Sequence, residues 1–408
     1  SDNGARWIKT KVNVEDHIEN GQGFVDDYVS RLTMKPLDRS RPLWDIHILN
    51  VKTSDAEAVC VMRCNHSLGD GMSLMSLLVA CTLKASNPDA FLSIPAIKRR
   101  EHFLSIFVIH YVVSLIWNTI VDLLQVSATV LFLKDTKTPL KNGGGSAENN
   151  PMRFYHRSLS LDDIRFIKNA MDMVSYDLLS MMFYSGITQT AISRYLNRQY
   201  GNTNVEGGTS TSDLNNIPSK TRLRALIPVN LRQEIGIQPV AKMLAKGSKC
   251  RWGNYNGLVH FPLSISLETD PLVNLSKTKS IMDRKKHSLM AALVYSNNEF
   301  IFNIFGPKVG AVLFNRTMSN TTTMFSNIVG PVEKVSLHGN QIAYIAVSAY
   351  GKGNTQALLI HFISYAEKMI ISIGVDPTVI PDPHIICDEM EESLKAIKEA
   401  LSVKNDIK

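Results

Sequence analysis

The spacing of apolar residues along the chain predicts a mixture of strands and helices. Alternating or short apolar runs predict strands over residues 6–14, 57–64, 152–159, 222–229, 258–267 and 342–350, and a strand pair within 356–375. A turn-rich segment at residues 36–49 leads into another strand. Apolar residues three or four apart predict helices over residues 24–32, 72–84, 161–172, 176–198 and 383–401. This mixture is typical of a layered α/β architecture.

A long apolar tract stands apart from this pattern. Residues 103–121 contain no Asp, Glu, Lys or Arg, and apolar sequence resumes after Asp122 as far as Leu133. Such a tract can span a bilayer, lie in its surface or pack as a helix against the protein. Polar residues recur along one side, at Ser105, His110, Ser114 and Asn118. We favour contact with a membrane, with the basic cluster Lys98–Arg100 on the cytoplasmic side.

Length and linker composition predict two domains. A chain of 408 residues is too long for one compact core. Residues 134–150 include Gly143–Ser146 and have the composition of a linker, so we expect one domain at residues 1–133 and another at 151–408. The chain begins with Ser1 rather than Met, so we expect natural sequence to precede it.

Charge and cysteine content exclude several classes of protein. The formal net charge is +7, and the Lys and Arg residues are scattered, so we expect no nucleic-acid partner. The basic excess suits an anionic membrane surface or the phosphates of a nucleotide. Five cysteines without a CxxC pair indicate reduced thiols in a cytosol-facing protein, with no zinc site and no disulfide framework. Cys60 and Cys64 share one face of a strand, where we expect small core residues.

The segment Asn65–Gly71 joins a predicted strand to a predicted helix and carries the candidate chemistry. A neutral imidazole at the end of a strand, such as that of His66, can accept a proton from an attacking alcohol. Asp70 can cap the helix, and Gly71 allows tight backbone geometry beside it. By spacing alone HxxxDG is moderately specific, and a single histidine in a loop is more often structural than catalytic.

Six segments occur in order along nearly the whole chain and carry a family resemblance. They are PLDRSRPLWDIHIL, NHSLGDGMSLMSLL, IPVNLR, RWGNYNG, FSNIVGPVE and HFISYAEKM, which begin at residues 36, 65, 227, 251, 325 and 361. Together they resemble the plant wax ester synthase/diacylglycerol acyltransferase family. That family is a branch of the CoA-dependent acyltransferases with the chloramphenicol-acetyltransferase fold. The shared order of the segments is more specific than any one of them.

The resemblance implies an α/β protein of two chloramphenicol-acetyltransferase-like domains that meet at a substrate tunnel. Acyl-CoA would enter from one side and the alcohol from the other, with His66 at the junction as the general base. The aspartate that matches Asp70 is structural in that family and pairs with an arginine, for which Arg232 is our candidate. We expect Trp44 to pack in the core.

The negative oxygen that forms during acyl transfer needs a preorganised hydrogen-bond donor. By resemblance and by chemistry we expect Ser326 and Asn327, in a polar turn ahead of Gly330, to supply it. The alternative is that these residues simply form the turn, as Ser and Asn often do. Asn254 is expected either to bind polar groups of the substrate or to shape its loop.

Two positions depart from the family pattern. The family has a histidine before the catalytic one, and this chain has Asn65, which can still support His66 as a neutral hydrogen-bonding group. The family's Asn-Asp pair in the second domain corresponds to Tyr176-Asp177. These differences predict reduced activity or an altered acceptor preference. They also leave open a catalytically weak relative that binds lipid or acyl-CoA.

The sequence therefore predicts a long-chain acyl-CoA:alcohol O-acyltransferase, with a fatty alcohol as first choice of acceptor and diacylglycerol as second. No nucleophile of the GxSxG type stands out, so we expect direct transfer without an acyl-enzyme. Acyl-CoA would be the co-substrate, and we expect no bound cofactor or metal. An acyltransferase for a small soluble alcohol or amine is the alternative. The resemblance to plant enzymes implies the endoplasmic reticulum membrane, facing the cytosol, with the plasma membrane as a second location.

Overall fold

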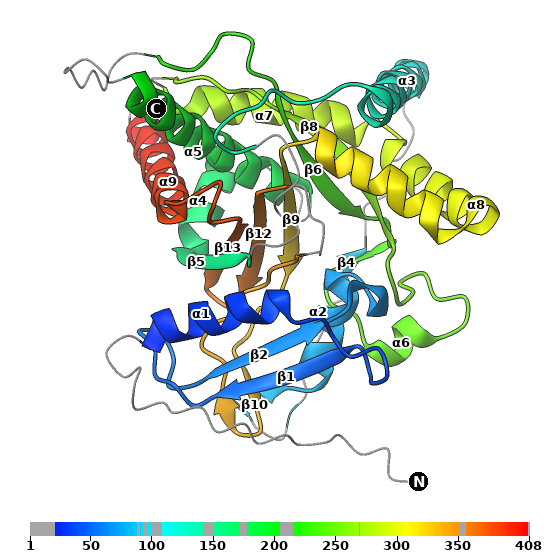
Figure 1. The fold of residues 1–408 in the computed structure, drawn as a ribbon, viewed down its shortest axis with the longest axis vertical. Helices are drawn as coiled ribbons and strands as arrows, with labels where there is room; N and C mark the ends of the chain where they lie inside the picture. The colour runs from blue at the N-terminus through cyan, green and yellow to red at the C-terminus, as the bar shows by residue number, and fades with distance from the viewer. Residues whose placement is uncertain are drawn as a thin grey trace. The chain divides into compact units, whose positions relative to one another are not determined.

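The computed structural model describes most of the chain (Figure 1). The described residues are 21–87, 90, 92, 97–98, 108–141, 151–171, 178–204, 215–268, 270–350 and 356–406. The chain divides into two compact units, residues 1–65 and residues 66–408, which we call the N-terminal unit and the main unit. The strand expected at residues 6–14 lies outside the described residues.

The N-terminal unit consists of a helix packed on a pair of strands. The helix α1 (Gly21–Met34) covers one face of an antiparallel pair, β1 (Trp44–Leu49) and β2 (Val59–Cys64). Leu49 of β1 is buried in a small core with apolar residues of α1. The helix and the two strands predicted for this part of the chain are confirmed.

The other face of the β1–β2 pair is apolar and exposed. Alternation places Trp44, Ile46 and Ile48 on it, and they are 43%, 49% and 67% exposed. The prediction that Trp44 packs in the core is therefore wrong. Cys60 and Cys64 lie opposite residues of this face and are not buried, so the expectation that they are core residues is also wrong. Alternation identified the strands, but it does not say which apolar face a helix covers.

The main unit contains a six-stranded sheet. Its strands are β5 (Arg153–Ser160), β6 (Leu223–Asn230), β8 (Asn256–Leu263), β9 (Thr323–Val329), β12 (Leu358–Tyr365) and β13 (Lys368–Val375). They run in the order β5-β13-β12-β9-β6-β8, with β9 parallel to β6 and β12 and the other neighbours antiparallel. The ladders β11-β10-β3 and β4-β7 are formed by β3 (Leu83–Lys84), β4 (Ile97–Lys98), β7 (Glu234–Ile235), β10 (Val335–Leu337) and β11 (Asn340–Gln341).

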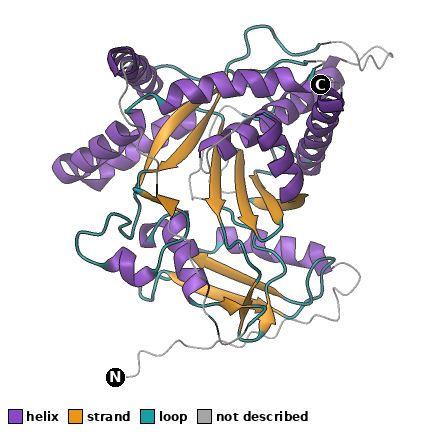
Figure 2. Ribbon diagram, turned by 180° about the vertical axis from the view of Figure 1, so that it is seen from behind, coloured by secondary structure: helices purple, strands orange, loops and turns teal. Residues whose placement is uncertain are grey.

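Helices surround this sheet (Figure 2). They are α2 (Gly71–Ala80), α3 (Val108–Leu131), α4 (Leu161–Ala170), α5 (Leu178–Asn204), α6 (Val240–Leu244), α7 (Pro271–Lys286), α8 (Met290–Asn320) and α9 (Pro383–Asp406). The predictions of α2, α4, α5 and α9 are confirmed. The two neighbouring helices α7 and α8 were not predicted, because apolar residues do not gather on one side of either helix.

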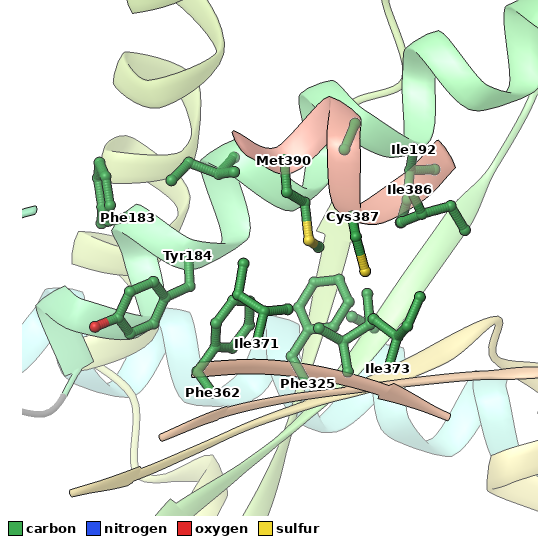
Figure 3. Close-up of a cluster of buried hydrophobic side chains, with 14 of the residues drawn as sticks. Phe183, Tyr184, Ile192, Phe325, Phe362, Ile371, Ile373, Ile386, Cys387 and Met390 are labelled. Carbon is green, nitrogen blue, oxygen red and sulfur yellow. The ribbon is translucent and has the colours of Figure 1, made fainter. Parts of the chain in front are cut away.

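One face of the six-stranded sheet carries the main hydrophobic core. Phe325, Phe362 and Ile373 reach from β9, β12 and β13 toward helices α5 and α9, where Ile192 and Met390 meet them (Figure 3). Fully burying a side chain of this size contributes roughly 1.5–3 kcal/mol. Because residues alternate along a strand, every second residue of these three strands faces this core and the others face the opposite side.

Helix α2 and residues 342–350 pack on the opposite face of the sheet. Met75 of α2 is buried there with Ile328 of β9 and Ile363 of β12. Residues 342–350 contribute further apolar side chains but belong to no strand, so the strand predicted there is wrong. Their alternating pattern reflects side chains that pack onto the sheet, and such packing does not require a neighbouring strand.

Part of the predicted linker is bound to the sheet. Asp135 is buried and accepts hydrogen bonds from the main-chain N–H and the Nε of Arg224, at 2.7 and 2.6 Å. The hydroxyl of Thr322 donates to it at 2.6 Å. Residues 142–150 lie outside the described residues, so the domain boundary at residues 134–150 stays a prediction.

Candidate active site

The loop that carries His66 leads directly into a capped helix. His66–Leu68 form a short 3-10 turn, and α2 then begins at Gly71. Asp70 is the N-cap of α2, and its Oδ1 accepts from the main-chain N–H of Ser73 at 3.1 Å. A Cβ at position 71 would lie 2.6 Å from Cδ1 of Ile328, so glycine lets α2 begin this close to β9.

Arg232 follows strand β6 and binds Asp70 at the start of α2. The ion pair expected between Asp70 and Arg232 is present, with Nη1 2.7 Å from Oδ2 and both side chains buried. The other acceptors of its guanidinium are Asn230 Oδ1 at 3.1 Å, Arg251 O at 2.9 Å, Ser73 Oγ at 3.1 Å and Gly253 O at 2.8 Å. All five N–H groups of the guanidinium therefore have acceptors.

Residues 252–255 hold the main chain of the His66 loop. The indole N–H of Trp252 donates to the carbonyl of Leu68 at 2.7 Å, and Nδ2 of Asn254 donates to the carbonyl of His66 at 2.8 Å. The main-chain N–H of Tyr255 donates to Oδ2 of Asp70 at 3.0 Å. Asn254 was expected to contact substrate or to shape its loop, and the structure gives its amide nitrogen a partner in the chain itself.

The imidazole of His66 is exposed, in contrast to its fixed main chain. A second histidine, His361 of β12, is 3% exposed and has no hydrogen-bond partner for its Nδ1 among the described residues. Burial, and to a lesser degree electrostatic interaction with His66, lower the pKa of the His361 imidazole to about 4. His361 is therefore neutral near neutral pH and lies within electrostatic reach of His66.

His361 belongs to a row of polar residues that crosses four strands. It lies opposite Ser326 of β9 on one side and Ser372 of β13 on the other, and Ser372 lies opposite His156 of β5. Residues in register across a sheet share a face, so this row lies on the side away from the main core. The hydroxyls of Ser372 and Ser348 are 2.6 Å apart.

Ser326 and Asn327 do not form a turn, as the sequence suggested, but lie within β9. They are neighbours in a strand, so their side chains point to opposite faces of the sheet. Ser326 shares the face of His361, whereas Asn327 lies opposite Phe362, on the side of the main core. The turn prediction failed because Ser and Asn are common in turns, while here they interrupt an otherwise apolar strand.

Asn65 is the last residue of the N-terminal unit. The main-chain N–H of Asn65 donates to the carbonyl of Leu43 at 2.8 Å within the N-terminal unit. Tyr176 and Asp177 lie outside the described residues. Among the residues that the structure describes, no three His, Cys, Asp or Glu side chains cluster in a way that suits a metal ion.

Sequence reasoning missed His361 and Trp252 as residues of this site. Both lie in segments that carried the family resemblance, HFISYAEKM and RWGNYNG. Their positions in those segments were the available signal. Leu68, which accepts from Trp252, is 184 residues away in the sequence. His66, which influences His361, is also distant in the sequence, and single-sequence patterns do not report such relations.

Comparison with known proteins identifies the family. Two family models match, the wax ester synthase/diacylglycerol acyltransferase catalytic domain over residues 20–178 and the WS/DGAT C-terminal domain over residues 252–398. Wax ester synthase/diacylglycerol acyltransferase 10 of Arabidopsis thaliana is 65% identical over 99% of this chain and 86% of its own. Wax ester synthase/diacylglycerol acyltransferase 7 of the same plant is 56% identical over 98% and 87%.

A solved structure extends the comparison to the fold. The wax ester synthase/diacylglycerol acyltransferase from Marinobacter aquaeolei VT8 matches 93% of this chain and 77% of its own, at 16% sequence identity and a TM-score of 0.54. This similarity confirms the expected α/β fold of two chloramphenicol-acetyltransferase-like domains. With both family models matched and close relatives similar along almost the whole length, the chain belongs to the wax ester synthase/diacylglycerol acyltransferase family.

Proposed function

We propose that this chain transfers a long-chain acyl group from coenzyme A to the hydroxyl of a fatty alcohol, with His66 as the general base. As a member of its family the chain is an O-acyltransferase that forms wax esters or triacylglycerol from acyl-CoA. Its relatives are named for both activities, wax ester synthase and diacylglycerol acyltransferase. The preference for a fatty alcohol over diacylglycerol is therefore part of the proposal.

The observation that carries the proposal is a fixed main chain with an exposed imidazole at His66. Asn254 and Trp252 donate to the carbonyls of His66 and Leu68, and Asp70 anchors the end of the same loop to Arg232. A base whose backbone is already held needs little reorganisation when the substrates arrive. This arrangement supports a catalytic role for His66 over the purely structural one.

In the proposed reaction His66 accepts the proton of the alcohol as its oxygen attacks the carbonyl carbon of the thioester. The tetrahedral intermediate carries a negative oxygen and collapses when the carbon–sulfur bond breaks. The thiolate of coenzyme A takes the proton from His66, which returns to its neutral form. Transfer is direct, so we propose acyl-CoA as a co-substrate and no bound cofactor or metal.

Ser326 is the proposed donor to the negative oxygen. Its side chain shares a sheet face with His361, whose pKa is influenced by His66. It also shares that face with Ile328, against which α2 begins. A hydroxyl fixed near the base can donate a hydrogen bond as charge develops on the oxygen. Asn327 points to the other face, so the proposal assigns this role to Ser326.

We further propose that α3 holds the enzyme at a membrane, with the cytosolic face of the endoplasmic reticulum as the location. Residues His110–Leu131 form a helix that is long and apolar enough to cross a membrane, and Asp122 and Thr129 are the only buried residues among them. One side of α3 is bound to the protein, because Asp122 is buried and accepts from Nζ of Lys285 at 2.6 Å. A buried ion pair on one side and apolar residues on the other favour a helix that lies in the membrane surface.

An acceptor panel tests the proposed reaction. The full chain receives palmitoyl-CoA with hexadecanol, dioleoylglycerol or ethanol, and both free CoA and ester are measured. We expect equal amounts of CoA and ester with hexadecanol, and slower formation of ester with dioleoylglycerol. Ester with ethanol alone would replace the lipid acceptor with a small soluble one. Binding of palmitoyl-CoA without any ester would contradict the enzyme and support a lipid-binding relative.

A further inference from the structure

Helix α8 is a hairpin of two helical arms. Gly306 has φ 80° and ψ 170°, outside the helical region, and Pro307 follows it. A straight helix of 31 residues would be about 46 Å long. Both ends of α8 lie against α3, because Leu289 N–H donates to Thr119 Oγ1 at 3.0 Å and Asn320 Nδ2 to Thr129 O at 2.7 Å. These two positions on α3 are about 15 Å apart, so the arms must fold back.

The arms also pack on each other near the bend. A Cβ at Gly310 would lie 2.8 Å from the ring of Phe302, which comes from the other arm. We call residues 300–314, which surround the bend, the α8 tip. In Figures 1 and 2 α8 extends outward from the sheet edge formed by β8.

The α8 tip exposes an unusual amount of apolar surface. Seven large apolar side chains there are between 41% and 64% exposed, namely Phe300, Phe302, Ile304, Phe305, Val309, Val312 and Phe314. Burying one such side chain fully is worth roughly 1.5–3 kcal/mol, so leaving this many in water is unfavourable. A cluster of this kind on one projecting element marks an interaction site.

Charge points to a lipid surface as the occupant. Between Glu299 and Asn320 the sequence has no Asp or Glu, and its charged residues are Lys308 and Arg316. The only polar side chains of the α8 tip are Asn303 and Lys308. A protein partner usually meets a polar rim with about one hydrogen bond per 100–200 Å². A bilayer with anionic headgroups binds an element that has apolar side chains to insert and basic side chains beside them. The α8 tip has both.

The exposed face of α3 is apolar as well. Trp117 and Leu124 of α3 are 66% and 65% exposed, and the two helices are joined at both ends of α8. Away from the bend at Gly306 the backbone of both elements is helical and satisfies its own hydrogen bonds, which suits contact with lipid. The α8 tip is therefore a second exposed apolar element, at the far end of a helical hairpin whose two ends are bonded to α3.

We propose that the α8 tip inserts into the boundary between lipid headgroups and acyl chains and anchors the enzyme to the membrane together with α3. The inference extends the membrane contact proposed above. It does not depend on the identity of the acceptor, because membrane binding is measured without any reaction.

Flotation with vesicles tests the anchor. The full chain is floated with vesicles of phosphatidylcholine and phosphatidylserine, beside the variant Ile304→Glu/Phe305→Glu/Val312→Glu. These side chains are exposed, so the variant should fold, and we expect its vesicle binding to fall about tenfold or more. The control Leu244→Glu/Val403→Glu changes exposed apolar residues elsewhere and should bind like the parent. Equal binding by parent and tip variant would overturn the proposal.

Depth is measured with a tryptophan at the bend. In a Trp117→Phe background, Phe305→Trp should add a blue-shifted emission with vesicles that is quenched by lipids brominated on their acyl chains. An unshifted, unquenched emission would contradict insertion. Light scattering without vesicles tests self-association. If the parent is a dimer, the tip variant is a monomer and both float equally with vesicles, the tip instead binds a second copy of the chain. Transfer to detergent-dispersed hexadecanol should be unchanged in the tip variant, which separates loss of anchoring from loss of chemistry.

Discussion

Arg232 donates all five of its guanidinium N–H groups, and the acceptors come from the start of α2, the end of β6 and residues 251–253. Lysine carries a point charge and cannot reproduce this fork of donors. The arginine links the residues that follow His66 to the segment that holds the His66 carbonyl. Loss of its side chain would leave Asp70 as a buried charge without a cation.

Arg232→Ala should lower the free energy of unfolding by roughly 3–5 kcal/mol, the usual cost of breaking a buried ion pair. Arg232→Lys should restore part of that loss, because it returns the charge without the fork. Chemical denaturation measures both. Arg165→Ala, which removes an exposed ion pair with Asp162, should change stability by about 1 kcal/mol or less. If Arg232→Ala lowers the free energy of unfolding no more than Arg165→Ala does, the ion pair between Arg232 and Asp70 does not stabilise the fold as proposed.

Ser326 and Asn327 offer a matched test of the oxyanion donor, since they are adjacent but face opposite sides of β9. Ser326→Ala should lower kcat about a hundredfold or more and leave KM for palmitoyl-CoA nearly unchanged. Asn327→Ala should keep kcat per folded molecule close to that of the parent. If Asn327→Ala loses as much kcat as Ser326→Ala, the assignment based on sheet faces is wrong.

His361 makes stability depend on pH in the acid range. Its pKa is about 4 in the folded protein and close to 6.5 in the unfolded chain, so the unfolded chain takes up a proton first as the pH falls. The contribution of neutral His361 is complete above pH 6.5 and is lost between about pH 6.5 and 4, on the order of 3 kcal/mol in all. His361→Gln should flatten this part of the stability profile, measured by denaturation from pH 7 to 4. The same slope in parent and variant would contradict the burial of an uncharged imidazole.

The position of helix α2 depends on the close approach of its first turn to strand β9. Asp70 caps the helix, and the helix begins against Ile328 because position 71 has no side chain. The same helix packs on the sheet face that carries Ser326 and His361. The position of the His66 loop on this face therefore depends on how closely α2 approaches β9.

Gly71→Ala should cost roughly 1–3 kcal/mol of stability, because its Cβ would lie 2.6 Å from Cδ1 of Ile328. The double variant with Ile328→Val, which removes that Cδ1 atom, should recover part of the loss. Ile328→Val alone should cost roughly 0.5–1.5 kcal/mol. A double-mutant cycle by thermal or chemical denaturation measures the coupling. Strictly additive losses would show that the two residues do not compete for the same space.

For the molecule as a whole, the family motifs that occur in order along the chain gave the most information about fold and site. HxxxDG with PVNLR led to the Asp70–Arg232 pair, and alternating apolar residues predicted the long strands of the sheet. These features are local or are carried by family motifs. Trp44 and residues 342–350 were misjudged because alternation reports two faces of a segment but not what covers them.

Other features of the molecule arise from contacts between distant segments. His361 lies opposite Ser326 only because β12 pairs with β9, and Trp252 donates to the carbonyl of Leu68 from a distant segment of the chain. The hairpin of α8 was missed because its apolar residues surround the helix and leave no amphipathic stripe to recognise. The sequence therefore indicated His66 and the buried ion pair, while the buried imidazole of His361 and the exposed apolar tip of α8 required the structure.

The catalytic role of His66 is tested by the rate of ester formation from palmitoyl-CoA and hexadecanol by His66→Ala, beside the surface control His384→Ala. Removing a general base typically lowers the rate by roughly a hundred- to ten-thousand-fold. We expect that loss for His66→Ala, with unchanged thermal stability and unchanged palmitoyl-CoA binding, and parental activity for His384→Ala. A folded His66→Ala protein that forms ester at the parental rate would contradict the role of His66 as the catalytic base.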